Sequence, residues 1–379
     1  MSGVTERWLA AATVLLVLAG CSVSDADEQE SWDSLDVAAV TRDSVAAVYL
    51  IDPDVKNADQ QRGGSIAFLD AQGDVTTLQT GWADNGRIAM SASGDVAWAS
   101  EDDSFLLRGE NRYRHRHGGV MYTEAMSIVD GRVVQVLDDV ETTDDGRTWT
   151  RSSLPATGQV GLDGTAVLGA SDWGPPGTPR RTLWSVVPGG SPRKVATWKT
   201  AGDPTGERLS MVSRLFASAG RAWFLEDVRT SDGSRLSLAS VDLRTGKYRS
   251  TVVRRWAASS QSEAPRGGNH PAGFYQRGHL HEGRLFFVDG TGHVCGASLE
   301  TARLSCAPRV LPDPSDTDED AGVETTWSGG ELVMLTTGGS PALERFDIVT
   351  GKRTSRIDVP GLQEFLDAEQ RNVASLAVR

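Results

Sequence analysis

The sequence lacks an excess of basic residues, and this limits the partners that charge alone can recruit. Lysine and arginine together number 38, whereas aspartate and glutamate number 51, which leaves a net charge of −13. Nucleic-acid binding requires clustered positive charge, and so does electrostatic adhesion to anionic lipid headgroups. We therefore expect neither nucleic acid nor a purely electrostatic membrane contact as a partner.

Several catalytic motifs are also missing. The chain contains no glycine-rich phosphate loop, no Gly-x-Ser-x-Gly turn and no His-Glu-x-x-His pair, so none of the chemistries that depend on them is expected. Runs of helix-forming residues are few, whereas glycine is abundant with 41 residues, and 39% of the residues are hydrophobic. This composition favours a packed fold built from strands and turns.

The apolar run near the N-terminus is too short to cross a bilayer. Trp8–Gly20 has 13 residues, and as a helix it would extend about 20 Å, short of the roughly 30 Å hydrocarbon core. Its length and position predict the hydrophobic segment of a signal peptide. A buried apolar helix is the alternative.

This run ends in Leu18-Ala19-Gly20-Cys21, which resembles the lipobox of bacterial lipoproteins. The resemblance implies cleavage between Gly20 and Cys21 and acylation of the Cys21 thiol, through which the protein would contact the lipid bilayer. We predict a signal peptide at residues 1–20, a lipidated cysteine and polar tether at 21–36, and a folded domain at 37–379 on the extracytoplasmic face of the cell membrane. A secreted protein with an unmodified cysteine is the alternative.

The two other cysteines, Cys295 and Cys306, flank a hairpin-like run. If its turn centres on Glu300 and Thr301, the two cysteines face each other on neighbouring strands, close enough to bridge. An exported chain meets oxidising conditions. We therefore predict a Cys295–Cys306 disulfide, with two free buried thiols as the alternative.

A strand–turn unit repeats along the chain. Residues 240–247 (Ser-Val-Asp-Leu-Arg-Thr-Gly-Lys) recur as 345–352 (Arg-Phe-Asp-Ile-Val-Thr-Gly-Lys), and residues 297–303 form a weaker copy. The unit predicts a strand, a tight turn in which glycine can adopt positive φ, and a second strand.

Earlier turns continue this rhythm, so that seven outer hairpins can be counted. Their turns lie at Gly73-Asp74, Gly109-Glu110, Asp145-Gly146, Gly189-Gly190, Thr245-Gly246, Thr301 and Thr350-Gly351. Apolar runs expected to form inner strands precede most of them, at 87–90, 132–136, 165–168, 221–225, 284–288 and 331–335. Propeller blades repeat every 40–50 residues or so.

The two ends of the domain support a closed ring. Ser44–Ile51 is a strand without a preceding hairpin partner, and Asn372–Val378 is a strand without a following one, so we expect the last strand to join the first blade. The fold class predicted is an all-β, seven-bladed β-propeller. Six or eight blades and a two-domain sandwich are the alternatives.

One local motif resembles a known hairpin signature. Thr142-Thr143-Asp144-Asp145-Gly146-Arg147-Thr148-Trp149 is similar to the Asp-box, Ser/Thr-x-Asp-x-Gly-x-Thr-Trp, which is common in sialidases and other secreted propellers. The resemblance implies structural roles for Thr142, Asp144, Gly146, Thr148 and Trp149 at the outer rim of a blade. It therefore implies a fold and no catalytic residue.

A sialidase-like or other glycan-directed hydrolase is the enzymatic alternative. Such enzymes need an arginine cluster, a Tyr–Glu nucleophile pair and an acidic Asp. Only five tyrosines occur; Tyr122 with Glu124, and Tyr275, are the ones that could project into a channel. No familiar arginine motif accompanies them, so we predict no catalytic residue.

Candidate metal ligands also have simpler explanations. His115 and His117 share one strand face, as do His279 and His281, but spacing assigns no third ligand to either pair. The acidic stretch 313–322 departs from the EF-hand pattern, and the acids at 52–59 form a weaker case. We expect polar strands and solvated loops here, with no bound metal and no cofactor.

The function predicted from these observations is that of a membrane-anchored extracytoplasmic lipoprotein. Its propeller would serve as a non-enzymatic binding or scaffolding module for a protein or glycan ligand, because propellers present loops and a central channel where ligands bind.

Overall fold

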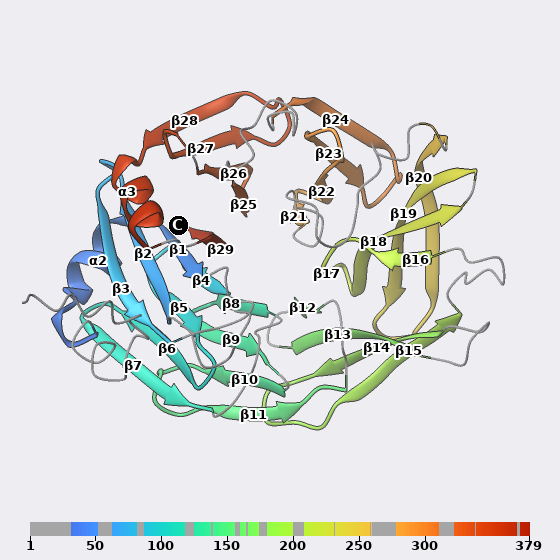
Figure 1. Ribbon diagram of the computed structural model, residues 1–379. Coiled ribbons are helices and arrows are strands. Elements are labelled where there is room, and N and C mark those ends of the chain that lie inside the picture. Colours follow the sequence, from blue (N-terminus) through green and yellow to red (C-terminus); the bar gives the residue numbers. More distant parts are fainter. Residues whose placement is uncertain are drawn as a thin grey trace, which may run out of the picture.

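The computed structural model is a closed ring of seven blades around a central axis (Figure 1). It describes residues 32–51, 63–81, 87–117, 125–137, 139–155, 160–163, 166–173, 180–199, 208–230, 232–257, 259, 278–310, 322–337, 339–369 and 372–379. The predicted signal peptide, Cys21 and most of the tether lie outside these ranges. Within them, no helix is both long and apolar enough to cross a membrane.

Each blade is a four-stranded antiparallel sheet that begins near the axis and ends at the rim. Blade 1 contains β29 (Asn372–Val378), β1 (Ser44–Ile51), β2 (Gly64–Asp70) and β3 (Val75–Thr80); blade 2 contains β4 (Ile88–Met90), β5 (Val96–Ala99), β6 (Asp103–Arg108) and β7 (Asn111–Arg116); blade 3 contains β8 (Ala125–Val129), β9 (Arg132–Val136), β10 (Asp139–Thr143) and β11 (Thr150–Ser153). Blade 4 contains β12 (Val160–Asp163), β13 (Ala166–Trp173), β14 (Arg180–Val186) and β15 (Arg193–Lys199); blade 5 contains β17 (Leu215–Ser218), β18 (Arg221–Thr230), β19 (Gly233–Asp242) and β20 (Tyr248–Ala257). Blade 6 contains β21 (His279–His281), β22 (Arg284–Val288), β23 (His293–Ser298) and β24 (Leu304–Arg309); blade 7 contains β25 (Val323–Ser328), β26 (Glu331–Thr336), β27 (Ala342–Asp347) and β28 (Arg353–Asp358).

The predicted seven-bladed propeller is therefore confirmed. Blades 4 and 5 are linked by a short parallel pairing of β12 with β17, and an additional strand, β16 (Arg208–Met211), pairs with β18. One expected strand has a different place in its blade: residues 88–90 form the innermost strand of blade 2, whereas the runs expected at 132–136, 221–225, 284–288 and 331–335 are second strands.

The last strand closes the ring as expected. β29 pairs antiparallel with β1, from Ala46 opposite Val378 to Ile51 opposite Asn372. It thereby supplies the innermost strand of blade 1, whose other three strands come from the N-terminal part of the chain. Leu376 of β29 is buried with apolar residues of blades 1 and 7, so the closure also joins the core between these two blades.

All seven predicted turns connect the third and fourth strands of a blade. In the β19–β20 turn, Oδ1 of Asp242 accepts hydrogen bonds from the backbone N–H groups of Arg244 and Thr245, at 3.1 and 2.7 Å. Asp347 makes the same bonds in the β27–β28 turn. The repeat therefore arises from a local turn in which an aspartate holds its own backbone.

The weaker copy in blade 6 has the same geometry with different residues. Ser298 replaces the aspartate and accepts a hydrogen bond from the backbone of Thr301, at 3.2 Å. Ala302 occupies the glycine position with φ of +55°. A non-glycine residue in this conformation is uncommon, which explains why the copy was weak in sequence.

Two helices cover the ring near its closure. α3 (Pro360–Glu369) places Leu362 and Leu366 in the core shared by blades 7 and 1. α2 (Val37–Asp43) precedes β1 and is capped by the Asp36 side chain, which accepts a hydrogen bond from the N–H of Ala39.

The folded part of the chain includes residues that the sequence placed in the tether. Trp32 and Leu35 are buried, each with 7% exposure, and Trp32 packs against Trp98 and Phe105 of blade 2. The guanidinium of Arg112 donates hydrogen bonds to the carbonyls of both Trp32 and Leu35. These contacts attach residues 32–36 to blade 2 ahead of the expected boundary at residue 37.

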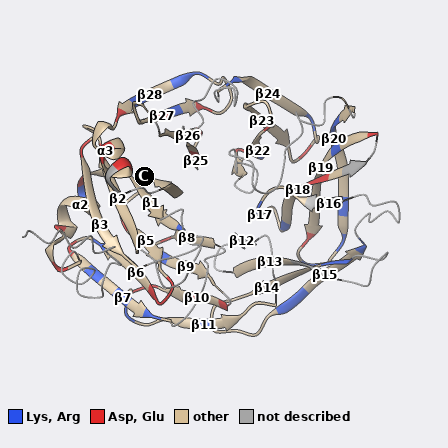
Figure 2. Ribbon diagram, viewed as in Figure 1, with Lys and Arg blue, Asp and Glu red and all other residues tan. Residues whose placement is uncertain are grey.

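Charge is unevenly distributed over the blades. Figure 2 shows Lys and Arg on the outermost strands β7, β15, β20 and β28. Within the seven outermost strands, Asp358 at the end of β28 is the sole acidic residue. The outermost strands are therefore basic although the whole chain is acidic.

Candidate ligand groove between blades 5 and 6

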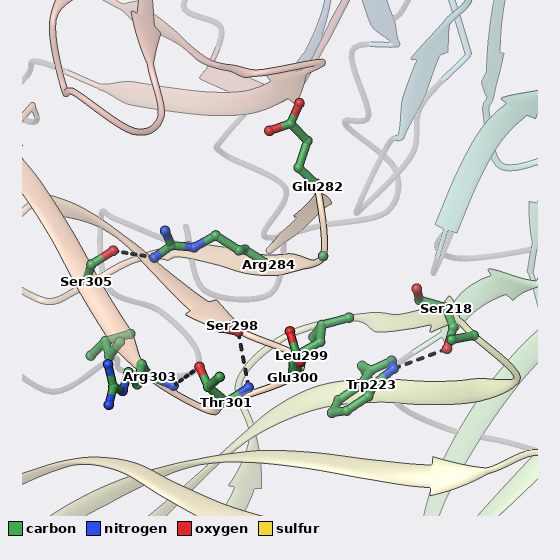
Figure 3. Close-up of a pocket in the computed structure, with 13 residues that line it drawn as sticks. Ser218, Trp223, Glu282, Arg284, Ser298, Leu299, Glu300, Thr301, Arg303 and Ser305 are labelled. Carbon is green, nitrogen blue, oxygen red and sulfur yellow. Dashed lines mark hydrogen bonds between the residues drawn. The ribbon is translucent and has the colours of Figure 1, made fainter.

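A groove of about 820 Å³ lies where turns of blades 5 and 6 meet (Figure 3). Blade 5 contributes the β17–β18 turn and Trp223 of β18, and blade 6 contributes the β21–β22 turn, Arg284 and the tip of the β23–β24 hairpin. The lining residues are Ser218, Ala219, Trp223, Glu282, Gly283, Arg284, Ser298, Leu299, Glu300, Thr301, Arg303, Leu304 and Ser305. Its volume is within the range typical of small-molecule sites, and we call it the blade 5–6 groove.

Trp223 forms a fixed, partly buried wall of the groove. Its Nε1 donates a hydrogen bond to the carbonyl of Ser218, at 3.2 Å, and the Arg221 guanidinium lies 5.5 Å from the centroid of its ring. The indole donor is thus already used, so the ring offers the groove apolar surface. The sequence predicts a core strand at 221–225 and does not reveal this role of Trp223, because only the packing of blade 6 against blade 5 creates the groove.

The opposite wall is a hairpin held by a disulfide. Cys295 and Cys306 are direct cross-strand neighbours, with Cα atoms 4.0 Å apart, and their sulfurs are bonded. The predicted Cys295–Cys306 disulfide is therefore confirmed. It lies next to Ser305 at the base of the hairpin tip and limits how far β23 and β24 can separate.

The charged side chains of the groove do not form a catalytic pair. Arg284 donates hydrogen bonds to the carbonyl of Gly296, at 2.7 Å, and to the Ser305 hydroxyl. The side chain of Glu282 is 82% exposed, and Figure 3 shows it extending away from the hairpin that carries Glu300. A glycoside hydrolase needs two carboxyl groups flanking one bond, and these two glutamates do not converge.

A second cavity, of about 230 Å³, lies among the innermost strands. Apolar residues such as Val134, Val167, Phe216 and Leu280 dominate its lining, with Arg214 and Ser127 as polar members. The described lining of this channel cavity contains neither a tyrosine nor a carboxylate. Tyr122, Glu124 and Tyr275, the residues considered for an enzymatic channel, lie outside the described residues.

One tyrosine–glutamate contact does occur, at the junction of blades 4 and 5. The Tyr248 hydroxyl donates to Oε2 of Glu226, at 2.5 Å, and Oε1 of Glu226 pairs with Arg181, at 3.1 Å. The side chains of Arg181 and Glu226 are each 2% exposed. Burial and the Glu226 carboxylate raise the pKa of Tyr248, which favours the protonated hydroxyl that donates to Glu226.

The Asp-box-like stretch forms the outer hairpin of blade 3, with a different aspartate in the organising role. Oδ1 of Asp145 accepts from the backbone N–H groups of Arg147 and Thr148, both at 2.8 Å, and these bonds lower the pKa of Asp145 to about 2. Asp144, which the resemblance assigned to this role, instead pairs with Arg132, at 2.6 Å. The expectation for Asp144 was therefore wrong, because the turn begins one residue later than the motif spacing suggests.

Other positions of the stretch behave as the resemblance implies, with one shift. Gly146 has φ of +76°, and Trp149 stacks on His115 of blade 2 with ring centroids 4.8 Å apart. The hydroxyl that accepts from the Gly146 N–H belongs to Thr143, whereas Thr142 is buried within β10. Thr148 donates its hydroxyl to Asp145.

The histidine pairs belong to the packing between blades. The rings of His279 and His281 stack at 6.0 Å, which confirms that they share a face, and His279 also stacks on Trp327 of blade 7 and hydrogen-bonds the carbonyl of Gly329. Burial lowers the pKa of both His279 and His117.

Among the described residues, three potential metal ligands come together at one place, formed by Asp289, Cys295 and Cys306. The two sulfurs are bonded to each other, so they are not available as thiolate ligands. The acidic stretches at 52–59 and 313–321 lie outside the described residues.

The chain matches a family model and is similar to several solved structures. No curated protein matches the chain. Among solved structures it is similar to apo AztD from Citrobacter koseri (12% identity, 89% of this chain and 98% of that one, TM-score 0.49). It is also similar to a quinonprotein alcohol dehydrogenase-like protein from Bacteroides thetaiotaomicron (8% identity, 88% of this chain and 91% of that one, TM-score 0.44). A further similar structure is BamB from Moraxella catarrhalis (10% identity, 82% of this chain and 82% of that one, TM-score 0.40). A family model described as "YycP, beta-propeller domain" matches residues 187–378, just over half of the chain. The chain therefore belongs to the YycP beta-propeller domain family.

Proposed function

We propose that this protein is a lipoprotein anchored through Cys21 on the extracytoplasmic face of the cell membrane, where its propeller binds a protein or glycan ligand without converting it. The observation that carries the binding role is the blade 5–6 groove. It combines an apolar ring surface at Trp223, several hydroxyl groups and a disulfide-held wall. Such a preformed surface suits recognition, because little order has to be created on binding.

The anchor rests on the Leu18-Ala19-Gly20-Cys21 sequence and is supported by two features of the folded part. A disulfide at Cys295–Cys306 suits a protein that folds in an oxidising compartment. Residues 32–36 are attached to blade 2, which leaves residues 22–31 as the tether between the anchor and the ring. The outermost strands that carry Lys or Arg belong to six of the seven blades and do not form one patch that could replace the anchor.

A glycan-directed hydrolase is the rival function. In the described part of the chain, neither the groove nor the channel cavity presents convergent carboxylates, and the tyrosine–glutamate contact is buried away from both. These observations favour binding over hydrolysis.

Binding is tested with a fragment from residue 22, because every described strand and helix and the ring closure lie within 32–379. Peptide and oligosaccharide arrays should yield a ligand whose binding is lost in Trp223→Ala. Trp184→Ala, which removes a partly buried tryptophan between blades 3 and 4, should bind normally. Turnover of a fluorogenic glycoside that is abolished by replacing Glu282 or Glu300 would establish the hydrolase instead.

The anchor is tested by Cys21→Ser in the producing cell. The variant should either enter the medium as a folded domain or remain as uncleaved precursor, and its thermal unfolding should match that of the wild-type domain. A fully processed variant that stays on the membrane would disprove lipid anchoring at Cys21.

A further inference from the structure

We infer that the ligand of the blade 5–6 groove is an uncharged oligosaccharide, an inference that rests on the binding function proposed above. The protein itself already uses many of the hydrogen-bonding groups of the groove. Those that remain define the chemistry that a ligand has to supply.

The backbone around the groove has little left to offer. The Leu299 N–H donates to the carbonyl of Gly283, at 2.9 Å, which joins the hairpin tip to the β21–β22 turn. The N–H groups of Ser298 and Ala302 donate to the carbonyls of Arg303 and Ser298, at 3.0 and 2.9 Å. A peptide bound in extended form pairs with free backbone groups of a strand edge. The turns do not provide such an edge, and the unpaired edge of β24 reaches the groove only at Leu304 and Ser305.

The hydroxyl groups, in contrast, retain their donors. Ser298 accepts from the Thr301 N–H, Thr301 accepts from the Arg303 N–H, and Ser305 accepts from Arg284. A hydroxyl has one donor and two acceptor positions, so in each case the protein uses an acceptor position and leaves the O–H able to donate. The groove therefore presents a set of donors on one wall, which favours a ligand rich in oxygen acceptors.

Trp223 supplies the complementary apolar surface on the other wall. Its N–H is bonded to Ser218, and the Arg221 guanidinium holds the ring in place. A sugar ring has C–H groups on its faces and hydroxyl and ether oxygens around its edge. It can therefore pack a face on the part of Trp223 that lines the groove and is not covered by Arg221, while its oxygens accept hydrogen bonds from the hydroxyl wall.

The charges of the lining select against an ionised sugar. Arg284 and Arg303 are balanced by Glu282 and Glu300, so the lining has no net charge. Arg284 is already bonded to a carbonyl and a hydroxyl, and Glu300 lies at the same hairpin tip as Arg303. An acidic sugar would be attracted by Arg303 and repelled by Glu282 and Glu300, whereas an uncharged sugar chain would be neither attracted nor repelled by these charges. A volume of about 820 Å³ suits several linked sugars better than one.

The test uses the fragment from residue 22 and calorimetric titration with four named probes. These are tetraacetylchitotetraose and cellotetraose as uncharged chains, tetragalacturonate as an acidic chain, and an alanine–glycine hexapeptide. At least one uncharged chain should bind at least tenfold more tightly than tetragalacturonate and the peptide. Trp223→Ala should weaken that binding at least tenfold and Thr301→Val severalfold, while Trp184→Ala, the matched control, should bind like the wild type.

The outcomes separate this inference from the function on which it rests. Binding of the peptide or of tetragalacturonate, lost in Trp223→Ala, would overturn the uncharged oligosaccharide and leave the binding function standing. Cleavage of a bound oligosaccharide, detected by mass spectrometry of the products, would overturn the non-enzymatic function while keeping the ligand class. Absence of binding by a folded fragment to all four probes would overturn the inference, and a negative array screen would then remove the binding function as well.

Discussion

Removing the Cys295–Cys306 disulfide should destabilise the protein by a predictable amount and loosen one wall of the groove. The bond spans a sequence separation of 11 residues. A cross-link that closes a loop of this size lowers the entropy of the unfolded chain enough to contribute about 3 kcal/mol. Unfolding entropy scales with chain length, so for a ring of roughly 350 residues this corresponds to a drop of about 4 °C in Tm if the ring unfolds as one unit.

The perturbation is the double variant Cys295→Ala/Cys306→Ala, followed by calorimetry and urea unfolding. Wild-type protein whose disulfide has been reduced under unfolding conditions is the matched control, because it loses the same cross-link without the loss of the buried Cys295 sulfur. Reducing agent should leave the stability of the double variant unchanged. A loss of stability below about 1 kcal/mol in both the variant and the reduced protein would refute the loop-entropy reasoning.

A local measurement separates the hairpin from the ring. Hydrogen exchange at residues 298–305 should accelerate in the double variant, whereas exchange in β1 and β29 should follow only the global change. Cys306 is exposed but Cys295 is fully buried, with its sulfur 3.9 Å from the Asp289 carboxylate. An external thiolate that attacks Cys306 has to expel a thiolate at Cys295 beside that carboxylate, so native reduction should be slow compared with reduction in urea.

Three further predictions concern the ring itself. Burial lowers the pKa of His117 below its ordinary value of 6.5, so the unfolded chain takes up a proton as pH falls through 6.5 while the folded chain does not. Stability should therefore decline from pH 7.5 to pH 5 in urea titrations, and His117→Phe should show a smaller decline. Asp145→Ala should lower the Tm more than its neighbour Asp144→Ala in thermal scans, the reverse of what the motif spacing suggests. Leu376→Ala in the closing strand should cost about 2–5 kcal/mol, whereas Asn372→Ala, at an exposed position of the same strand, should be nearly neutral.

The parts of the fold that could be predicted from the sequence are those governed by local chemistry. The Asp242 and Asp347 turns each need an aspartate, a threonine and a glycine at fixed spacing, so the repeat was visible and the seven outer hairpins followed from it. The disulfide could be predicted for the same reason, since the register of a hairpin depends on its turn. Asp144 shows the limit of such reasoning: two adjacent aspartates fit the motif, and only the backbone conformation shows that Asp145 holds the turn.

The candidate groove could not be predicted, because no single segment contains it. Trp223 and Arg284 lie on different blades, and the Ser298–Ser305 hairpin tip was recognisable as a turn but not as a wall. The buried Arg181–Glu226–Tyr248 contact is similar, since its members come from three strands of two blades. Contacts of this kind depend on how neighbouring blades pack, and short sequence motifs do not record that packing.

The positions of the charged residues in the fold change the interpretation of the net charge. The net charge of −13 does not show where the acidic residues lie. Acids such as Asp145, Asp242 and Asp347 lie in turns, where they accept hydrogen bonds from backbone N–H groups. The outermost strand of each blade has one unpaired edge, and such edges can pair with a strand of another molecule. Six of the seven outermost strands carry Lys or Arg, and charged side chains on an edge strand hinder its pairing with a second copy. The innermost strands other than β12 and β17, which pair with each other, also have one unpaired edge, but it faces the central axis of the ring, where a strand of another copy does not reach it (Figure 1). Charged edges at the rim therefore suffice to keep copies apart, while the groove, which is made mainly of turns, remains open to a ligand.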